Sequence, residues 1–288
     1  MKSYIDIHSH ILPGLDDGPE NMEQCVEAAR RYRAIGMDCV IATPHWFNFT
    51  GWSSSPEQII RKAAEVEQAL KEAGAVLKIL PGMEIGFTDR LEQDFQESRL
   101  LPLGASGFYL IEFPLMVAFM KPEQLILPLM RRQKKTRVIL AHPERCIAFL
   151  DNDASLRVME AKGVLVQMNI SSILGGFGKQ IQQTAVRLLR KGLVHFLATD
   201  SHASGRRMPP DINEWDMLRE YIGGPAVVQA CSINPRRLLA GESVNPVLPD
   251  VKRLDKYFPG TCNKNYNKMS NLDSNRGYAG RFLGLFSR

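Results

Sequence analysis

The stretch Tyr4-Ile5-Asp6-Ile7-His8-Ser9-His10 begins as a short run of β-forming apolar residues and ends in a His-x-His pair. Such a run predicts a buried β-strand. Asp16-Asp17-Gly18 follows a few residues later, in a loop that leaves the same end of the strand. Imidazole and carboxylate groups are the ligands that hold first-row metal ions in hydrolytic sites. The stretch therefore predicts a first strand that carries metal ligands at its carboxyl end.

Five of the six histidines lie in compact motifs, most of which contain an acidic residue. The motifs are Asp6-Ile7-His8-Ser9-His10, Ala42-Thr43-Pro44-His45, His142-Pro143-Glu144-Arg145 and Thr199-Asp200-Ser201-His202. His195 stands apart at the predicted start of a strand, and we expect it at the opposite face of the fold. Because imidazole and carboxylate recur together, the sequence indicates a metal-dependent hydrolase.

Short β-rich runs alternate with amphipathic helical stretches along the chain. Strands are predicted at 4–8, 39–43, 77–81, 108–113, 137–141, 164–169 and 195–199. Helices are predicted at 22–35, 56–73, 122–133, 154–161 and 179–191, with shorter helices at 214–221, 226–231 and 235–239. This alternation predicts a parallel sheet, and seven repeats favour a closed α/β barrel over an open sheet.

Polar side chains follow the end of every predicted strand. In strand order they are His8 and His10, His45, Glu84, Glu112, His142, Asn169, and finally Asp200 with His202. The carboxyl ends of the strands of a parallel barrel meet on one face, so we expect these side chains to lie together. Glu112 lies between Ile111 and Phe113, where a buried carboxylate without a partner would be costly. Asp17 is a further candidate ligand, although Asp16-Asp17-Gly18-Pro19 is also good turn chemistry.

Arginines lie beside two of the histidine motifs. Arg145 comes three residues after His142, and the pair Arg206-Arg207 follows His202. A guanidinium fork suits the oxygens of a phosphate group, but a solvated surface cation is the alternative for each. Arg145 has the better case for binding phosphate because it belongs to the motif itself.

Aromatic residues follow His45 directly: Trp46, Phe47, Phe49 and Trp52. They could form a wall for an aromatic substrate, or they could only pack the loop. The glycine-rich stretch 173–179 follows the sixth strand and resembles an anion-binding loop only weakly, so a mobile rim loop is an equal alternative.

Charge is unevenly distributed along the 288 residues, which carry a net charge of +5. Residues 251–288 contain eight Lys or Arg and two Asp, and they lack helical or strand periodicity. We therefore expect a barrel domain at 1–250 and a basic, disordered tail at 251–288. Because the basic charge belongs to this tail, the sequence does not predict a nucleic-acid partner. The tail could still dock acidic partners or a membrane surface.

The five cysteines are scattered and form no CxxC pair, which argues against a disulfide framework or a structural zinc site. No apolar run approaches the roughly 20 residues of a transmembrane helix, and we expect a cytoplasmic protein. The spacings from Cys25 to Arg31 and from Cys231 to Arg237 match the bare Cys-x5-Arg pattern of thiol-dependent tyrosine phosphatases. The first match lacks glycine, and the second places Pro235 where an N–H donor is needed, so neither predicts a nucleophile.

In combination the motifs resemble the polymerase-and-histidinol-phosphatase (PHP) superfamily. The stretches 11–19 and 169–178 look more closely like its branch of bacterial manganese-dependent protein-tyrosine phosphatases of capsule and exopolysaccharide biosynthesis. This resemblance implies a distorted (β/α)7 TIM-like barrel with a trinuclear metal centre, most simply of Mn²⁺, with Fe or Zn as alternatives. It also implies hydrolysis of a phosphotyrosine protein, a bacterial tyrosine autokinase, by a hydroxide that bridges two metal ions.

The same resemblance assigns roles residue by residue. The implied metal ligands are His8, His10, Asp17, His45, Glu84, Glu112, His142, Asp200 and His202. Arg145 and Arg207 would bind phosphate, although Arg206 competes for the second role.

Three rival functions follow from the same residues. A PHP phosphoesterase could act on a small phosphomonoester such as histidinol phosphate or a nucleotide. An amidohydrolase also has a barrel with His-x-His on its first strand, but it would use a lysine at the fourth strand, where this chain has Glu112. A non-catalytic regulator could keep the metal site as a scaffold, and the full ligand set argues against it.

Overall fold

The structure of the protein is a computed structural model, and it describes residues 3–47, 51–118, 121–133, 136–150, 153–203 and 205–260. Ten β-strands form the frame of these residues. The strands are β1 (Tyr4–Ser9), β2 (Met37–Ala42), β3 (His45–Phe47), β4 (Trp52–Ser53), β5 (Lys78–Pro81), β6 (Glu84–Gly86), β7 (Phe108–Glu112), β8 (Arg137–Leu140), β9 (Leu165–Asn169) and β10 (Phe196–Ala198). Each of the seven predicted strands is present, within a few residues of its predicted ends.

Two parallel sheets together trace one ring of strands in chain order. One sheet has the order β1-β2-β5, and the other has the order β10-β9-β8-β7-β6-β3-β4, in which only β3 and β4 are antiparallel. Since β3 continues β2 beyond Pro44 and β6 continues β5 beyond Gly82, the sheets join through two broken strands. The expected α/β barrel with distorted strands is confirmed.

The first and last strands meet through backbone hydrogen bonds. The N–H of Asp200 donates to the carbonyl of His8 at 2.9 Å, and the N–H of His10 donates to the carbonyl of Ser201 at 2.7 Å. Below them the buried carboxylate of Asp6 accepts the backbone N–H and the hydroxyl of Thr199. These bonds place the His-x-His pair directly beside the residues that follow β10.

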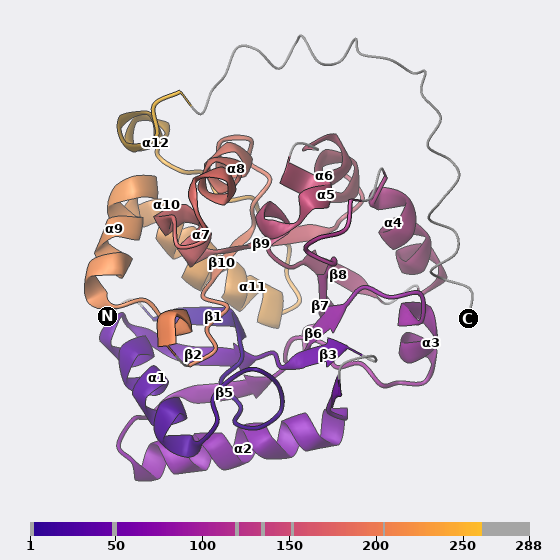
Figure 1. Cartoon of the computed structure of the whole chain (residues 1–288), viewed down its shortest axis with the longest axis vertical. Helices are drawn as coiled ribbons and strands as arrows, with labels where there is room; N and C mark the ends of the chain where they lie inside the picture. The colour runs from indigo at the N-terminus through magenta and orange to yellow at the C-terminus, as the bar shows by residue number, and fades with distance from the viewer. Residues whose placement is uncertain are drawn as a thin grey trace.

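Helices lie outside the strands, with α1 and α2 on one side and α5, α6 and α8 on the opposite side (Figure 1). The helices up to α6 are α1 (Met22–Ala34), α2 (Pro56–Glu72), α3 (Leu91–Gln96), α4 (Glu123–Arg132), α5 (Ile147–Leu150) and α6 (Asp153–Glu160). The later helices are α7 (Ile170–Leu174), α8 (Lys179–Arg190), α9 (Ile212–Ile222), α10 (Gly224–Val228), α11 (Asn234–Leu239) and α12 (Val251–Tyr257). Side-chain caps from Asn21, Ser55 and Asp211 satisfy backbone N–H groups at the starts of α1, α2 and α9.

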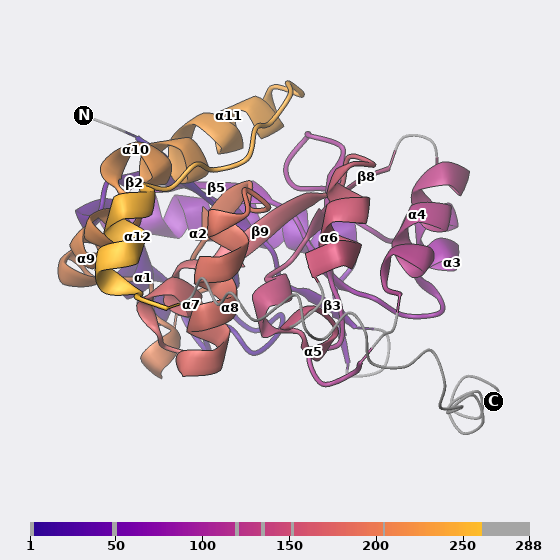
Figure 2. The same ribbon diagram turned by 90° about the horizontal axis from the view of Figure 1, so that it is seen from above.

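The helix α12 corrects the predicted boundary of the tail at residue 250. It packs beside α9 at one end of the molecule, opposite α3 and α4 (Figures 1 and 2). Leu254 is fully buried, and the rings of Tyr221 and Tyr257 lie 5.0 Å apart. Apolar side chains on a single short helix were too few to stand out in a basic segment. The rest of the expected tail, 261–288, lies outside the described residues.

None of the helices in the described ranges combines the length and the apolar character needed to cross a membrane.

His195 lies buried just before β10, away from the other histidines. Its Nδ1 accepts a hydrogen bond from the backbone N–H of Val166 at 3.2 Å. This nitrogen must therefore carry no proton, so the buried ring is neutral. Burial lowers the pKa of His195 from 6.5 to about 4. The expectation that this histidine has a structural place in the fold agrees with these contacts.

We expect His195 to make the protein less stable in mild acid. Between pH 6.5 and about pH 4, His195 is protonated in the unfolded chain but neutral in the folded protein. The free energy of unfolding therefore falls as the pH is lowered through this range. The wild type should lose about 2 kcal/mol more than His195→Asn between pH 7 and pH 5. Urea unfolding at both pH values measures this, and parallel losses in the two proteins would contradict it.

Candidate metal centre

Three overlapping groups of histidine and carboxylate side chains meet at the carboxyl ends of the strands. Within each group, one donor atom per residue lies within 4.8 Å of the others. The groups are His10, Asp17, His45 and His202; His8, His10, Glu84 and Asp200; and His45, Glu84 and Glu112. His142 completes the set, with its Nε2 at 2.9 Å from Glu84 and 3.6 Å from Glu112. The structure thus brings all nine predicted ligands together.

Glu84 lies at the centre of this arrangement. Its Oε2 is 3.2 Å from the Nε2 atoms of both His8 and His10 and 3.0 Å from Nδ1 of His45. Despite these distances, Oε2 of Glu84 and Nδ1 of His45 are buried without a hydrogen-bond partner, as is Nε2 of His202. Buried polar atoms normally have partners. These three unpartnered atoms, buried among other donors, fit divalent cations.

The Nδ1 atoms of His10 and His8 are held by Asp16 and Gln167, two residues that were not among the predicted site residues. Asp16 accepts from Nδ1 of His10 at 2.6 Å, and the side-chain carbonyl of Gln167 lies 3.0 Å from Nδ1 of His8. Both contacts leave Nε2 free to face the cluster, which is the usual way to orient a ligating histidine. Asp16 is therefore more than a turn residue, although its Oδ1 also accepts the N–H of Gly18. Burial favours the neutral form of Asp16, but the neighbouring His10 outweighs it and lowers the pKa to about 2.

Local backbone geometry sets the positions of the remaining donors. In the β3–β6 pair, His45 is directly opposite Glu84, and in the β6–β7 pair Gly86 is opposite Glu112. His142 and Asp200 have positive φ angles of 27° and 50°. Such angles cost energy in residues with a side chain and persist where the surrounding structure imposes them. The strained positions coincide with two candidate ligands.

The protonation states of three buried donors, Glu112, His142 and His202, also fit a cation. Burial and the adjacent charge of Glu84 raise the pKa of Glu112 well above its usual range. A divalent ion would relieve this repulsion between carboxylates. Burial lowers the pKa values of His142 and His202 to about 4, helped by the charges of Arg145 and His10 respectively. Both rings are then neutral near pH 7, as a metal ligand must be.

Two arginines border the donor groups. Arg145 donates from a guanidinium nitrogen to Asp200 at 2.6 Å, and its guanidinium lies over the ring of Phe177. Arg207 spans Asp17 and Asp200, at 3.3 and 3.2 Å. Both predicted phosphate-binding arginines therefore reach the site, whereas the side chain of Arg206 lies outside what the structure describes.

The aromatic residues near His45 divide between site and core. The ring of Trp52 stacks on His45 at 5.2 Å, and the ring of Phe47 lies 5.0 Å from it. Trp46 instead faces the core, because side chains alternate along β3, so for this residue the packing alternative holds. Phe49 lies outside the described residues.

The two cysteines with Cys-x5-Arg spacing, Cys25 and Cys231, do not provide a nucleophile. Cys25 is buried in α1 and donates to the carbonyls of Ile11 and Asn21, and burial raises its pKa to about 12. Cys231 donates to the carbonyl of Leu197, and burial raises its pKa well above the usual range. A thiol in either place stays protonated and unreactive.

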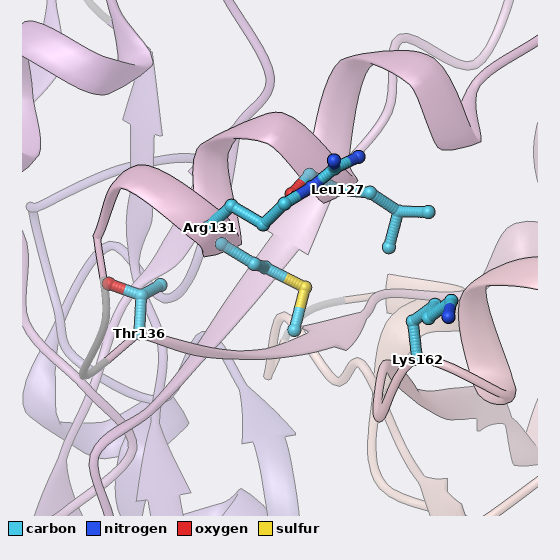
Figure 3. Close-up of a pocket in the computed structure, with 5 residues that line it drawn as sticks. Leu127, Arg131, Thr136 and Lys162 are labelled. Atoms are coloured by element: carbon cyan, nitrogen blue, oxygen red, sulfur yellow. The ribbon is translucent and has the colours of Figure 1, made fainter.

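Outside the centre, a cavity of about 460 Å³ lies between α4 and the segment after α6 (Figure 3). Its lining residues are Leu127, Met130, Arg131, Thr136 and Lys162. It contains none of the predicted site residues, so it offers no alternative place for the chemistry.

The fold and its convergent donors define an α/β barrel with a cluster of side chains of the kind that holds metal ions. Comparison with known proteins is more specific: residues 4–240 match the family model for capsular polysaccharide synthesis, CpsB/CapC. This chain belongs to that family.

Characterised relatives agree with this assignment. The chain is 35% identical to the tyrosine-protein phosphatase YwqE of Bacillus subtilis, over 69% of this chain and 77% of that protein. It is 27% identical to the tyrosine-protein phosphatase CpsB of Streptococcus pneumoniae, over 83% of this chain and all of that protein. Among solved structures, one from a study of YwqE and CpsB as metal-dependent tyrosine phosphatases matches with a TM-score of 0.74 and 30% identity, covering 85% of this chain and 99% of that one.

We expect two to three metal ions per chain after reconstitution with Mn²⁺, because the donors form three overlapping groups. Glu84→Gln should lose at least one ion, since Glu84 belongs to two of the groups. Elemental analysis of the purified proteins measures both, with the exposed Glu97→Gln as a matched control. One ion or fewer in the wild type would contradict the multinuclear site.

We expect turnover to depend on the donor groups and not on thiols. The double variant Cys25→Ser and Cys231→Ser should keep its rate within a few-fold, because both thiols are buried and protonated. His10→Ala or Asp200→Ala should lower kcat by at least about 10²-fold. A folded double cysteine variant without activity would exclude this mechanism.

Proposed function

We propose that this protein is a metal-dependent protein-tyrosine phosphatase whose metal ligands are Glu84 and the eight residues around it. The observation that carries the proposal is the convergence of unpartnered imidazole and carboxylate atoms, bordered by two arginines that reach the same carboxylate, Asp200. The proposed ligands are His8, His10, Asp17, His45, Glu84, Glu112, His142, Asp200 and His202. Membership of a family whose characterised relatives carry this activity supports the substrate class.

Bound divalent ions, which we propose to be Mn²⁺ with Fe or Zn as alternatives, would activate water and offset charge on a phosphoryl group. The residues of the chain supply the positioning. Asp16 and Gln167 hold the rings of His10 and His8, so the donor atoms do not need to reorganise. Hydrolysis then needs no covalent intermediate on a side chain.

Arg145 and Arg207 are suited to bind the phosphoryl oxygens. Both guanidinium groups now contact Asp200, and Arg207 is 35% exposed, so its fork can turn toward a substrate that enters from solvent. The ring of Phe177 supports Arg145, because the guanidinium carbon lies 4.4 Å from the centre of that ring. A planar guanidinium binds two oxygens at once and favours the charge that develops on them.

Phosphotyrosine fits this site better than an aliphatic phosphate. The proposed ligands occupy all the histidines of the centre, which leaves none of them as a proton donor. A phenolate, with a pKa of about 10, can leave without strong acid catalysis, whereas an alkoxide cannot. Trp52 and Phe47 beside His45 offer aromatic surface for the ring.

The physiological substrate is then a tyrosine-phosphorylated protein, and we propose a bacterial tyrosine autokinase of capsule or exopolysaccharide synthesis. A cytoplasmic location belongs to the same proposal. The family match and the four free cysteines among the described residues support it.

We expect a phosphotyrosine peptide to be hydrolysed at least about 10²-fold faster, in kcat/KM, than the same peptide with phosphoserine. Asp200→Asn should abolish both reactions, which excludes a contaminating phosphatase. Histidinol phosphate is measured in parallel. Equal rates for the two peptides, or a preference for histidinol phosphate, would replace the proposal with a general phosphoesterase.

A further inference from the structure

Two adjoining cavities form a groove that leads away from the metal centre. The first, of about 190 Å³, begins at Asp200 and Arg207. The second, of about 310 Å³, extends toward Arg31 of α1 and Asp211 at the start of α9. The residues that line both cavities are Ser171, Leu174, Met208 and Glu214. The groove therefore follows the contact between α7 and α9, which lie side by side (Figure 1).

The walls of the groove combine apolar and charged side chains. Leu174 and Met208 offer half-buried apolar surface to both cavities, and Gly176 leaves backbone accessible in the first. Glu214 also lines both cavities, and the second adds the charged side chains of Arg31 and Asp211. Apolar surface flanked by charges of both signs suits a chain with varied side chains better than a compact phosphate ester.

We propose that this groove binds the residues of the substrate polypeptide that flank the phosphotyrosine, an inference that rests on the proposed phosphatase function. A phosphoryl group held at Arg207 places the adjoining peptide at the mouth of the first cavity. A small ester ends at that point and leaves the groove empty. The groove is then a specificity device, because binding energy from residues remote from the reacting bond raises kcat/KM for the peptide alone.

The test compares kcat/KM for p-nitrophenyl phosphate with kcat/KM for a phosphotyrosine peptide that has several residues on each side. Met208→Ala removes apolar contact from both cavities, and Ser171→Trp fills them. We expect the peptide-to-ester ratio to fall about fivefold in the first variant and about tenfold in the second. The matched control is Met217→Ala on α9, which is exposed and lines neither cavity, and it should keep the wild-type ratio.

Each outcome separates the groove from the proposed function. If the wild type hydrolyses the peptide but both variants keep its ratio, the groove proposal is wrong and the phosphatase assignment stands. A fall in both substrates by the same factor would mean that these residues only support Arg207, which also overturns the proposal. If a variant keeps the wild-type peptide-to-ester ratio but sediments as a different oligomer, the groove binds a second copy of the chain, and the proposal is wrong. Because Ser171→Trp could misfold, thermal melting is measured for each variant, and Met208→Ala stands alone if needed.

Discussion

The carboxylate of Asp6 is the interaction on which the site depends, because it joins three elements at the place where the ring of strands closes. It accepts the N–H and the hydroxyl of Thr199 after β10, the hydroxyl of Tyr32 in α1, and the N–H of His8 within its own strand. Burial raises the pKa of Asp6 even though these donors favour its charged form. Removing any donor would leave part of a buried carboxylate unsatisfied, a loss of about 1–3 kcal/mol or more. The candidate ligands of β1 and those that follow β10 are thereby held at a fixed distance.

Above this junction the charges of the centre are balanced only in part. Glu84, Glu112 and Asp200 crowd one side, and the pKa of Glu112 rises because burial and Glu84 disfavour its charge. Arg145 and Arg207 offset some of this charge at the rim through Asp200. Divalent ions within the cluster would offset the rest.

Sequence reasoning predicted the elements whose signal is local. The predicted strands are short β-rich runs between amphipathic helices, and most of their side chains are buried. The candidate ligands come together because strand ends converge in any such barrel. The place of Trp46 stayed open because the short strand β3, which sets the direction of its side chain, follows a proline and lacks a clear pattern.

Other features could not be read from the chain because they depend on distant pairing. Gln167 orients His8 across 159 positions of sequence, and nothing in the residues near Gln167 marks it. The same holds for Tyr32, which looks like an ordinary core residue of α1 until its hydroxyl is seen on Asp6. Asp16 did carry a signal, since it lies in the same loop as Asp17, but turn chemistry explained it equally well. The helix α12 was hidden in a segment whose charge dominates its composition.

The joining of β1 to the residues after β10 also has a consequence for biosynthesis. His8 and His10 leave the ribosome almost two hundred residues before Asp200 and His202. Until Asp200 and His202 are made, only the group of His45, Glu84 and Glu112 has all its members. The other two candidate groups can therefore form only after β10 has joined β1, so their assembly reports that the strands at the two sides of this junction have met.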